Sequence, residues 1–384
     1  MAKRIGKALV VGGETIVSEA DWNAELDEKH AKIVEWLREQ KLAGVLIRRN
    51  ENVAWVTGGA VELRVLTPSE TGVASLLVTV EGKRYYFTTE NEASRLHDEE
   101  FGSLDFEPVL FPWYADGTPA AAAKLAAGPL GSDTPVPGTI AVNLLPLRAS
   151  LSESEISRYK WLGGGTAAAT VESLKQVKPG MSEYELEAMT AANLLKRGIM
   201  PSVYLFAVDD RIYKYKHAVA RGAKLKNYAM LNLCTRKWGL AISITRFVHF
   251  GAVPAELGAR FKSAAQVNAA LLDASKVGET SADLFRVAQV AYAAEGFPGE
   301  ERFHHQGGPT GYGEREWVAM PEGKESVVNK QAFAWNPSIR GGKAEDTVVL
   351  RDGKIEWLTA TPELPVIDAE VNGKAYPASG VLVG

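Results

Sequence analysis

The sequence predicts two domains, an α/β domain at the N-terminus and an α+β domain after it. Three observations support this prediction: helix and strand patterns alternate over roughly the first 150 residues, a polar, cap-rich segment follows, and the sequence beyond it repeats a helical unit. At 384 residues, 46% apolar and 23% charged, the chain is long enough for two cores. The expected organisation is 1–150, 151–362 and a C-terminal extension over 363–384.

The N-terminal domain opens with a helix predicted over 24–40, where four apolar residues recur at helical spacing. The short apolar segment 43–47 is expected to form a buried strand. Further strand and hairpin elements are expected at 53–59, 72–80 and 83–89.

The second domain is predicted to begin with a long helix from Ile156 to about Val177, opened by the polar segment Ser150–Glu155. The sequence then echoes itself. Residues 178–183 lead into a helix over 184–197, and residues 276–281 lead into a helix over 282–295, each followed by a glycine. This repetition suggests an internal pseudo-twofold, although periodicity alone leaves an unrelated α+β fold nearly as compatible.

The composition disfavours several partners. A formal net charge of -4 and a sequence pI near 6.0 give no bulk electrostatic reason to bind nucleic acid or an anionic membrane. The single cysteine, Cys234, cannot form an internal disulfide and fits a reducing compartment. With no signal-peptide pattern or apolar stretch of membrane-spanning length, a cytoplasmic protein with a small-molecule or short-peptide substrate is expected.

The segment Leu231–Arg246 carries the most specific pattern in the chain. Asn232 and Ser243 lie eleven positions apart in it, and Ile244-Thr245-Arg246 follows directly. The segment resembles the metal-binding hairpin of the pita-bread hydrolases, the family of methionine aminopeptidase, prolidase, aminopeptidase P and creatinase. In metal-dependent members, two aspartates at this separation bridge a pair of metal ions. The resemblance implies that Asn232 and Ser243 replace those ligands.

The family's other ligand motifs have counterparts too. Gly307-Gly-Pro-Thr-Gly311 resembles Gly-His-Gly-x-Gly, with Gly308 at the ligand histidine, and Arg315-Glu316 stands at a His-Glu pair that contacts substrate. Asn336-Pro337 resembles Glu-Pro, and Glu345-Asp346 keeps the last ligand motif. The resemblance implies that Glu345 alone survives among five ligands. Since one carboxylate cannot hold a divalent ion tightly, no metal and no other cofactor is expected.

The resemblance also implies an architecture. The first domain is expected to be creatinase-like, and the second to be a pita-bread domain, in which paired helices pack outside a curved antiparallel sheet with an internal pseudo-twofold. Its relatives form homodimers, so a homodimer is expected here.

His217 is the candidate acid–base residue. It lies fifteen positions ahead of Asn232, where the family carries a histidine that contacts substrate and shuttles protons. Creatinase, a metal-free member, uses this histidine as its base. The present chain lacks the usual His-x-Pro context and the glutamate that creatinase keeps after its hairpin.

The resulting hypothesis is a metal-independent hydrolase, similar to Xaa-Pro peptidases and creatinase, that cleaves a C–N bond of a small amide- or amidine-like substrate. The alternative is a non-catalytic ligand- or peptide-binding member of the family. The residues placed in the site are His217, Glu316 and Glu345 as catalytic groups, and Asn232, Ser243, Gly308, Arg315 and Asn336 as substrate contacts.

An arginine is expected to replace the missing metal charge. Without the metal, Glu345 and Glu316 would stand close together as like charges, and the Arg315 guanidinium can pair with a carboxylate. Arg315, or failing that Arg340 or Arg246, is therefore predicted to meet one of them. Arg315→Ala should then destabilise the fold more than Glu345→Ala.

Two further residue types are predicted to be structural. Adjacent side chains diverge on an extended chain, so at most one of His304 and His305 is expected to face the site, and neither to act as a ligand. Cys234 is expected to be a buried small hydrophobe on a strand.

Overall fold

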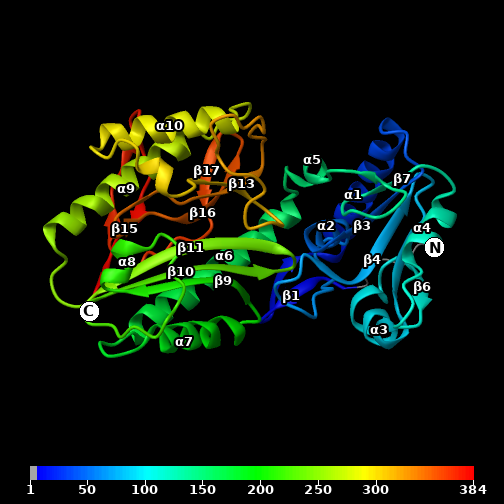
Figure 1. The fold of residues 1–384 in the computed structure, drawn as a ribbon, viewed down its shortest axis with the longest axis horizontal. Helices are drawn as coiled ribbons and strands as arrows, with labels where there is room; N and C mark the ends of the chain where they lie inside the picture. Colours follow the sequence, from blue (N-terminus) through cyan, green and yellow to red (C-terminus); the bar gives the residue numbers. More distant parts are fainter. Residues whose placement is uncertain (1–6) are drawn as a thin grey trace. The chain divides into compact units, whose positions relative to one another are not determined.

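The computed structural model describes residues 7–384, and the chain divides into two compact units. The first runs to Arg158 and includes Trp238–Leu240, and the second comprises Tyr159–Lys237 and Ala241–Gly384. The change of unit falls inside helix α6 (Glu153–Gln176), after the boundary predicted near residue 150. Figure 1 labels the elements along the chain.

The first unit is built on a six-stranded mixed sheet of order β6-β5-β4-β3-β7-β8, in which β3, β4 and β5 are antiparallel neighbours and the outer strands add in parallel. The strands are β3 (Gly44–Arg49), β4 (Thr71–Thr79), β5 (Arg84–Thr89), β6 (Glu107–Phe111), β7 (Leu130–Ser132) and β8 (Ile140–Ala141), preceded by the hairpin β1 (Leu9–Val11) and β2 (Glu14–Val17). The helices are α1 (Glu19–Glu39), α2 (Asn50–Val56), α3 (Glu90–Arg95), the π-helical η1 (Leu96–Phe101), α4 (Thr118–Ala126) and α5 (Leu145–Arg148). This mixture of helices and sheet confirms the predicted α/β class.

One predicted element of this unit is wrong. Residues 53–59 were expected to form a strand or hairpin, but they lie in helix α2 and the turn after it. Every residue of α2 after Glu51 is buried, including Trp55. A short apolar run buried on all sides has the same pattern in a helix and in a central strand, so its periodicity could not distinguish the two.

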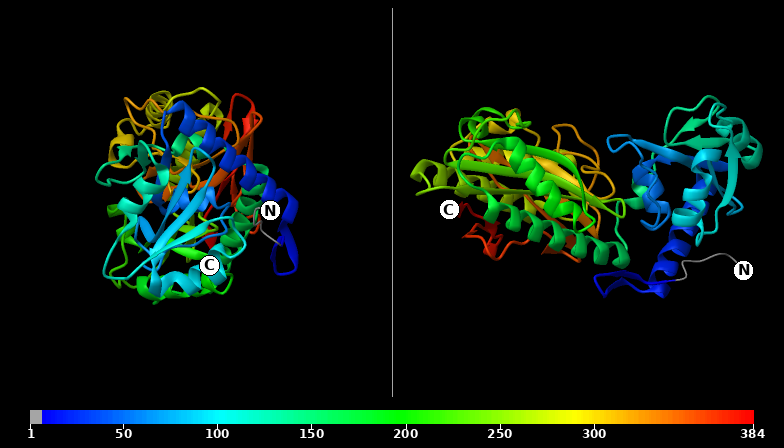
Figure 2. Two further views of the ribbon diagram at one scale, coloured as in Figure 1. Left: turned by 90° about the vertical axis from the view of Figure 1, so that its right-hand side faces the viewer. Right: turned by 90° about the horizontal axis from the view of Figure 1, so that it is seen from below.

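The second unit contains two four-stranded sheets between pairs of helices. One sheet has the order β22-β11-β10-β9 and the other the order β12-β13-β16-β17. Figure 1 shows α9 and α10 on the side of β13, β16 and β17, and α7 on the side of β9, β10 and β11. Figure 2, seen from below, shows the green helices running along the strands of the first sheet. This layering is the pita-bread architecture implied by the resemblance.

The bounds of the second unit's elements follow the chain. The strands are β9 (Met200–Val208), β10 (Tyr228–Lys237), β11 (Leu240–His249), β12 (Gly307–Thr310), β13 (Gln331–Trp335), β14 (Ser338–Ile339), β15 (Gly342–Lys343), β16 (Asp346–Arg351), β17 (Lys354–Trp357), β18 (Val366–Ile367), β19 (Glu370–Val371), β20 (Lys374–Ala375), β21 (Ala378–Ser379) and β22 (Leu382–Val383). After α6, the helices are α7 (Glu183–Leu195), α8 (Asp210–Lys214), α9 (Ala255–Ala274), α10 (Ser281–Ala294) and the 3₁₀ helix η2 (Glu300–Phe303).

The predicted internal repeat is visible in matched hydrogen bonds. Helix α7 begins with a capping box formed by Ser182 and Glu185, and α10 begins with the same device formed by Thr280 and Asp283. The two cap residues also make equivalent isolated antiparallel bridges, Ser182 to Lys224 and Thr280 to Ser326. The two halves therefore use one local design twice, which confirms the pseudo-twofold.

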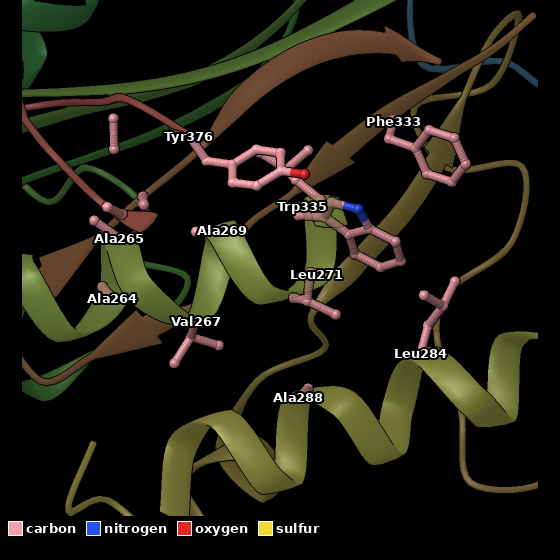
Figure 3. Packing of buried hydrophobic residues seen from close by; sticks show 14 of the residues in the cluster. Ala264, Ala265, Val267, Ala269, Leu271, Leu284, Ala288, Phe333, Trp335 and Tyr376 are labelled. Carbon is pink, nitrogen blue, oxygen red and sulfur yellow. The ribbon is translucent and has the colours of Figure 1, made fainter. Parts of the chain in front are cut away.

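The largest listed core of this unit lies between α9, α10 and the second sheet (Figure 3). Small residues such as Ala264 and Ala288 let the helices approach, and the rings of Phe333 and Trp335 fill the space beneath them. Trp335 also donates its indole N–H to the hydroxyl of Ser275 at 3.0 Å. This packing fixes β13, whose end carries one of the predicted site residues.

The C-terminal segment adds a strand to the first sheet. Strand β22 pairs in parallel with β11, with Val248 opposite Leu382. Among residues 7–384, no helix combines the length and the apolar character needed to cross a membrane.

Candidate active site

The hairpin of β10 and β11 places a row of polar residues on one face. Its two-residue turn, Trp238-Gly239, has positive φ at both positions (52° and 76°), as a tight hairpin requires. A turn of that length sets Cys234 opposite Ser243 and Asn232 opposite Thr245. The Sγ of Cys234 and the Oγ of Ser243 are 3.2 Å apart, in agreement with this register. Asn232, Ser243 and Thr245 therefore share one buried face.

Glu345, which precedes β16, is the centre of a buried ion network. Only 3% of the residue is exposed. Its Oε1 lies 3.0 Å from the Arg315 guanidinium, and its Oε2 lies 2.8 Å from the Lys343 ammonium group. The hydroxyl of Thr245 donates to the same Oε2 at 2.5 Å. Burial raises the pKa of this carboxyl, but Lys343 and Arg315 outweigh that effect and hold the pKa at about 2.

Arg315 connects this network to the hairpin. In addition to the Glu345 contact, its Nη1 donates to the hydroxyl of Ser243 at 2.8 Å and to the carbonyl of Glu314 at 2.6 Å. The prediction that Arg315 meets Glu345 is confirmed. Arg246, one of the fallback candidates, instead pairs with Asp346 and is 1% exposed.

Asn336 and Gly308 reach the same region through the second sheet. Trp335 pairs with Asp346 across β13 and β16, so Asn336 follows on the register next to Glu345. Its Oδ1 is buried and has no hydrogen-bond partner among the described residues. Gly308 lies on β12 opposite Ala334. The topology thus brings Ser243, Arg315 and Glu345 into direct contact, with Asn232 and Asn336 beside them.

Glu316 has a local task in the structure. Its Oε1 accepts hydrogen bonds from the backbone N–H groups of Tyr312 and Gly313, at 3.0 and 3.1 Å. These bonds hold the glycine-rich turn that follows β12. The predicted crowding of Glu316 against Glu345 is not what the hydrogen bonds show, because Glu345 takes its partners from Arg315, Lys343 and Thr245.

The three histidines His217, His304 and His305 form a cluster, which corrects one sequence expectation. The Nε2 atoms of His217 and His304 are 2.9 Å apart, and the ring of His305 stacks on that of His304 with centroids 4.7 Å apart. His305 also lies 5.8 Å from His217, centroid to centroid. Both adjacent histidines therefore face His217. They do not diverge because the chain here is an irregular segment after η2, not a regular strand.

The environment keeps these imidazoles neutral. Burial is the main cause that lowers the pKa of each ring, and the nearby Lys343 ammonium lowers it further in all three. The pKa of His305 falls to about 4, and those of His217 and His304 are also below their usual value. His217 is exposed, whereas His304 is only 9% exposed. The cluster thus offers one accessible imidazole backed by a buried one.

Cys234 has the predicted character of a buried strand residue, with 9% exposure on β10. Burial raises the pKa of its thiol to about 11. It is therefore a protonated thiol at neutral pH, not a reactive thiolate.

Sequence reasoning missed Lys343, Thr245 and the role of His304. Lys343 is two positions before Glu345 on the short ladder β14–β15, and Thr245 lies inside the Ile-Thr-Arg sequence that identified the hairpin. A lysine so close to the one retained ligand was the available signal. No pattern in the sequence could show that Thr245 and Lys343 would share Glu345 Oε2.

The residues at the predicted metal positions do not fit a pair of divalent ions. A metal ion beside Glu345 would have to displace Arg315 and Lys343 from its oxygens, and the Ser243 hydroxyl already accepts from Arg315. At Gly308, a Cβ would stand 2.3 Å from the carbonyl oxygen of Trp317, so a ligand histidine would have no room there. Two organic cations now lie where the family's metals would be expected.

Comparisons with known proteins agree with the fold and the site. Residues 163–352 match the model of "Metallopeptidase family M24", and residues 29–142 match "Creatinase/Prolidase N-terminal domain". A comparison with curated protein sequences finds no match.

Solved structures of peptidases share the whole architecture. Dipeptidase PepE from Mycobacterium ulcerans has 15% identity and a TM-score of 0.72, covering 88% of this chain and 96% of that one. An Xaa-Pro dipeptidase from Bacillus anthracis has 16% identity and a TM-score of 0.70, covering 93% and 99%. The prolidase from Pyrococcus horikoshii OT3 has 18% identity and a TM-score of 0.68, covering 87% and 98%.

The two matched models and the pita-bread layering define the class: a peptidase- or prolidase-like hydrolase fold with a creatinase-type N-terminal domain. The chain belongs to the creatinase/prolidase family of pita-bread proteins.

Proposed function

We propose that the chain is a metal-independent hydrolase that cleaves a C–N bond of a small amide- or amidine-like substrate, with His217 as general acid and base. The observation that carries the proposal is the pairing of exposed His217 with buried His304 through their Nε2 atoms, 2.9 Å apart. One proton can lie between these two nitrogens, so the pair fixes the tautomer of His217. Its other ring nitrogen, Nδ1, is then the one to face a substrate.

The pair can move a proton in both directions. When Nδ1 of His217 takes a proton from an attacking water, the resulting imidazolium donates from Nε2 to the Nε2 of His304. The same proton can then be given to the leaving nitrogen. General acid–base catalysis of this kind contributes about 10²- to 10⁴-fold in rate.

The ion network supplies positive charge for the reacting carbonyl or amidine carbon. Arg315 and Lys343 carry two positive charges against the single negative charge of Glu345, so the network keeps one excess positive charge. That charge favours an oxyanion that develops in the transition state. Asn232, Ser243 and Asn336 provide hydrogen-bonding groups on the same face.

The catalytic roles first predicted for Glu316 and Glu345 are not part of this proposal. Glu345 gives its oxygens to Arg315, Lys343 and Thr245, and Glu316 gives Oε1 to two backbone amides. Both act as positioning residues. The expected substrate therefore presents a carbonyl or anionic end to the site, and no carboxylate is free to bind a cationic end.

The test is turnover by the metal-stripped protein. Chelator-treated wild type, His217→Asn and the control His97→Asn would be assayed on Xaa-Pro dipeptides, small acylated amines and guanidino or amidino compounds. His97 is an exposed histidine of the other unit. We expect turnover in wild type and control and a loss of at least about a hundredfold in His217→Asn.

Two results would contradict the proposal. Turnover that appears only after Mn²⁺ or Co²⁺ is added would mean a metal-dependent hydrolase. Thermal stabilisation by a compound that no form of the protein cleaves would support the alternative, a non-catalytic ligand- or peptide-binding member of the family.

A further inference from the structure

We propose that His217, His304 and His305 form a binding site for one late first-row divalent metal ion, with Zn²⁺ as the expected ion. One ligand atom from each of the three residues lies within 4.8 Å of the others, and no other group of this kind is found among residues 7–384. The site is separate from the aspartate-type positions of the hairpin, where Arg315 and Lys343 stand.

The geometry needs little adjustment to hold an ion. Zn–N bonds of about 2.0–2.1 Å in a tetrahedral site place two ligand nitrogens about 3.3 Å apart. The Nε2 atoms of His217 and His304 are 2.9 Å apart, so a separation by a few tenths of an ångström would admit the ion. His217 is exposed and can make that movement.

The buried member of the site is held in place by its own support. The Gln306 side-chain amide donates to the carbonyl oxygen of His304, and its Oε1 accepts from the Tyr292 hydroxyl at 2.8 Å. His304 itself is 9% exposed, and its Nδ1 has no hydrogen-bond partner among the described residues. An imidazole that is buried, fixed and incompletely satisfied is a pre-positioned ligand and not a solvated surface residue.

His305 completes the set but has to give up a weak contact. Its Nδ1 accepts from the backbone N–H of Gly307 at 3.2 Å. Binding through Nε2 requires the tautomer with a proton on Nδ1, so this hydrogen bond is lost when the metal enters. The ring stays beside His304 through the stacking contact.

The ligand type selects the metal. Three neutral imidazoles with an open fourth position suit Zn²⁺, Co²⁺, Ni²⁺ or Cu²⁺, whereas Mg²⁺ and Ca²⁺ prefer oxygen ligands. Histidine has an ordinary pKa near 6.5, so at slightly alkaline pH protons compete little with the metal. Cys234 is not a ligand, because its thiol faces Ser243 on the hairpin.

The surrounding charges weaken the site without abolishing it. The cations that face it are Lys216, Lys343 and Arg315, and the anions are Glu300, which pairs with Lys216 at 2.6 Å, and Glu345, which pairs with the other two. One excess positive charge remains. We therefore expect binding weaker than at a catalytic zinc site of the same ligands.

The site has a consequence for the proposed hydrolase, although it does not rest on it. A metal ion that occupies Nε2 of His217 would remove the proton-transfer contact with His304. Zn²⁺ would then inhibit the metal-independent reaction.

The test is titration of the metal-stripped protein with Zn²⁺ by calorimetry and with Co²⁺ by visible absorption. We expect one ion per chain, a Co²⁺ spectrum without thiolate charge-transfer bands, and affinity reduced at least about tenfold in His305→Asn and in His304→Asn. His305 is exposed, so its variant should fold even if the His304 variant does not. The control His97→Asn should bind as wild type does.

The outcomes separate this inference from the proposed function. No binding in wild type, or unchanged affinity in His305→Asn, would overturn the three-histidine site. If Co²⁺ binds as expected but the stripped protein shows no turnover, the site stands and only the proposed hydrolase fails.

Discussion

The ion network predicts which of its members the fold can least afford to lose. Glu345→Ala would leave two cations, Arg315 and Lys343, without a carboxylate, and their side chains are only 15% and 6% exposed. Arg315→Ala would leave Glu345 with Lys343 and Thr245 still bound. Glu345→Ala should therefore be the more destabilising change. This reverses the order expected from the sequence, because Lys343 was not foreseen and Glu316 is held elsewhere.

The magnitude follows from the carboxyl's pKa. A folded-state pKa of about 2 against an ordinary 4.5 corresponds to about 3 kcal/mol of stability at neutral pH. Removing one partner of a buried ion pair costs about 3–5 kcal/mol, which agrees. We expect that loss for Glu345→Ala and about 1–3 kcal/mol for Arg315→Ala, since the partly exposed arginine leaves a carboxylate that stays paired.

Urea denaturation followed by tryptophan fluorescence would measure both variants, together with the double variant Arg315→Ala/Glu345→Ala. The exposed Glu363 supplies a matched control, and Glu363→Ala should change the unfolding free energy by less than about 0.5 kcal/mol. The double variant should be less destabilised than the sum of the single variants. If Arg315→Ala proves less stable than Glu345→Ala, the network does not work as described.

Three further predictions concern acid stability, packing and assembly. Because Glu345 has a folded-state pKa of about 2, its contribution is complete above pH 4.5 and is lost as the pH falls from there towards 2; acid denaturation of Glu345→Gln should lack this step, and an unchanged acid profile would contradict the assignment. Gly308→Ala should destabilise by about 1–3 kcal/mol, because the new Cβ meets Trp317 at 2.3 Å, whereas Gly164→Ala, with nothing within 4 Å, should be neutral or stabilising in a thermal melt. The family resemblance implies a homodimer, so light scattering at micromolar concentration should give twice the mass of 41.5 kDa, and a monomer would count against that expectation.

The fold was predictable where local signals agreed with each other. The two capping boxes at Ser182 and Thr280 can be read directly from the sequence, and they mark equivalent helix starts in the two halves. The Ile-Thr-Arg sequence located the hairpin in the same way. Helix α2 was not predictable, because a short apolar run buried on all sides gives no periodic signal.

The site was predictable only in part, since its chemistry depends on contacts between distant segments. Arg315 could be foreseen as a partner of Glu345 from charge balance alone. Lys343 could not be placed, because only the ladder β14–β15 turns its ammonium group towards Glu345. His304 and His305 were misjudged because the rule for side chains on strands was applied to an irregular segment.

The central claim is that Arg315 and Lys343 hold Glu345 where the family's metal-dependent members hold a pair of metal ions. Anomalous X-ray scattering from crystals of the protein equilibrated with Mn²⁺ and, separately, with Zn²⁺ would test it most directly. The account predicts no anomalous peak beside Ser243 and Glu345 with either ion, and Arg315 in place within hydrogen-bond distance of Glu345. Two peaks bridged by Glu345, with Arg315 and Lys343 displaced, would contradict it.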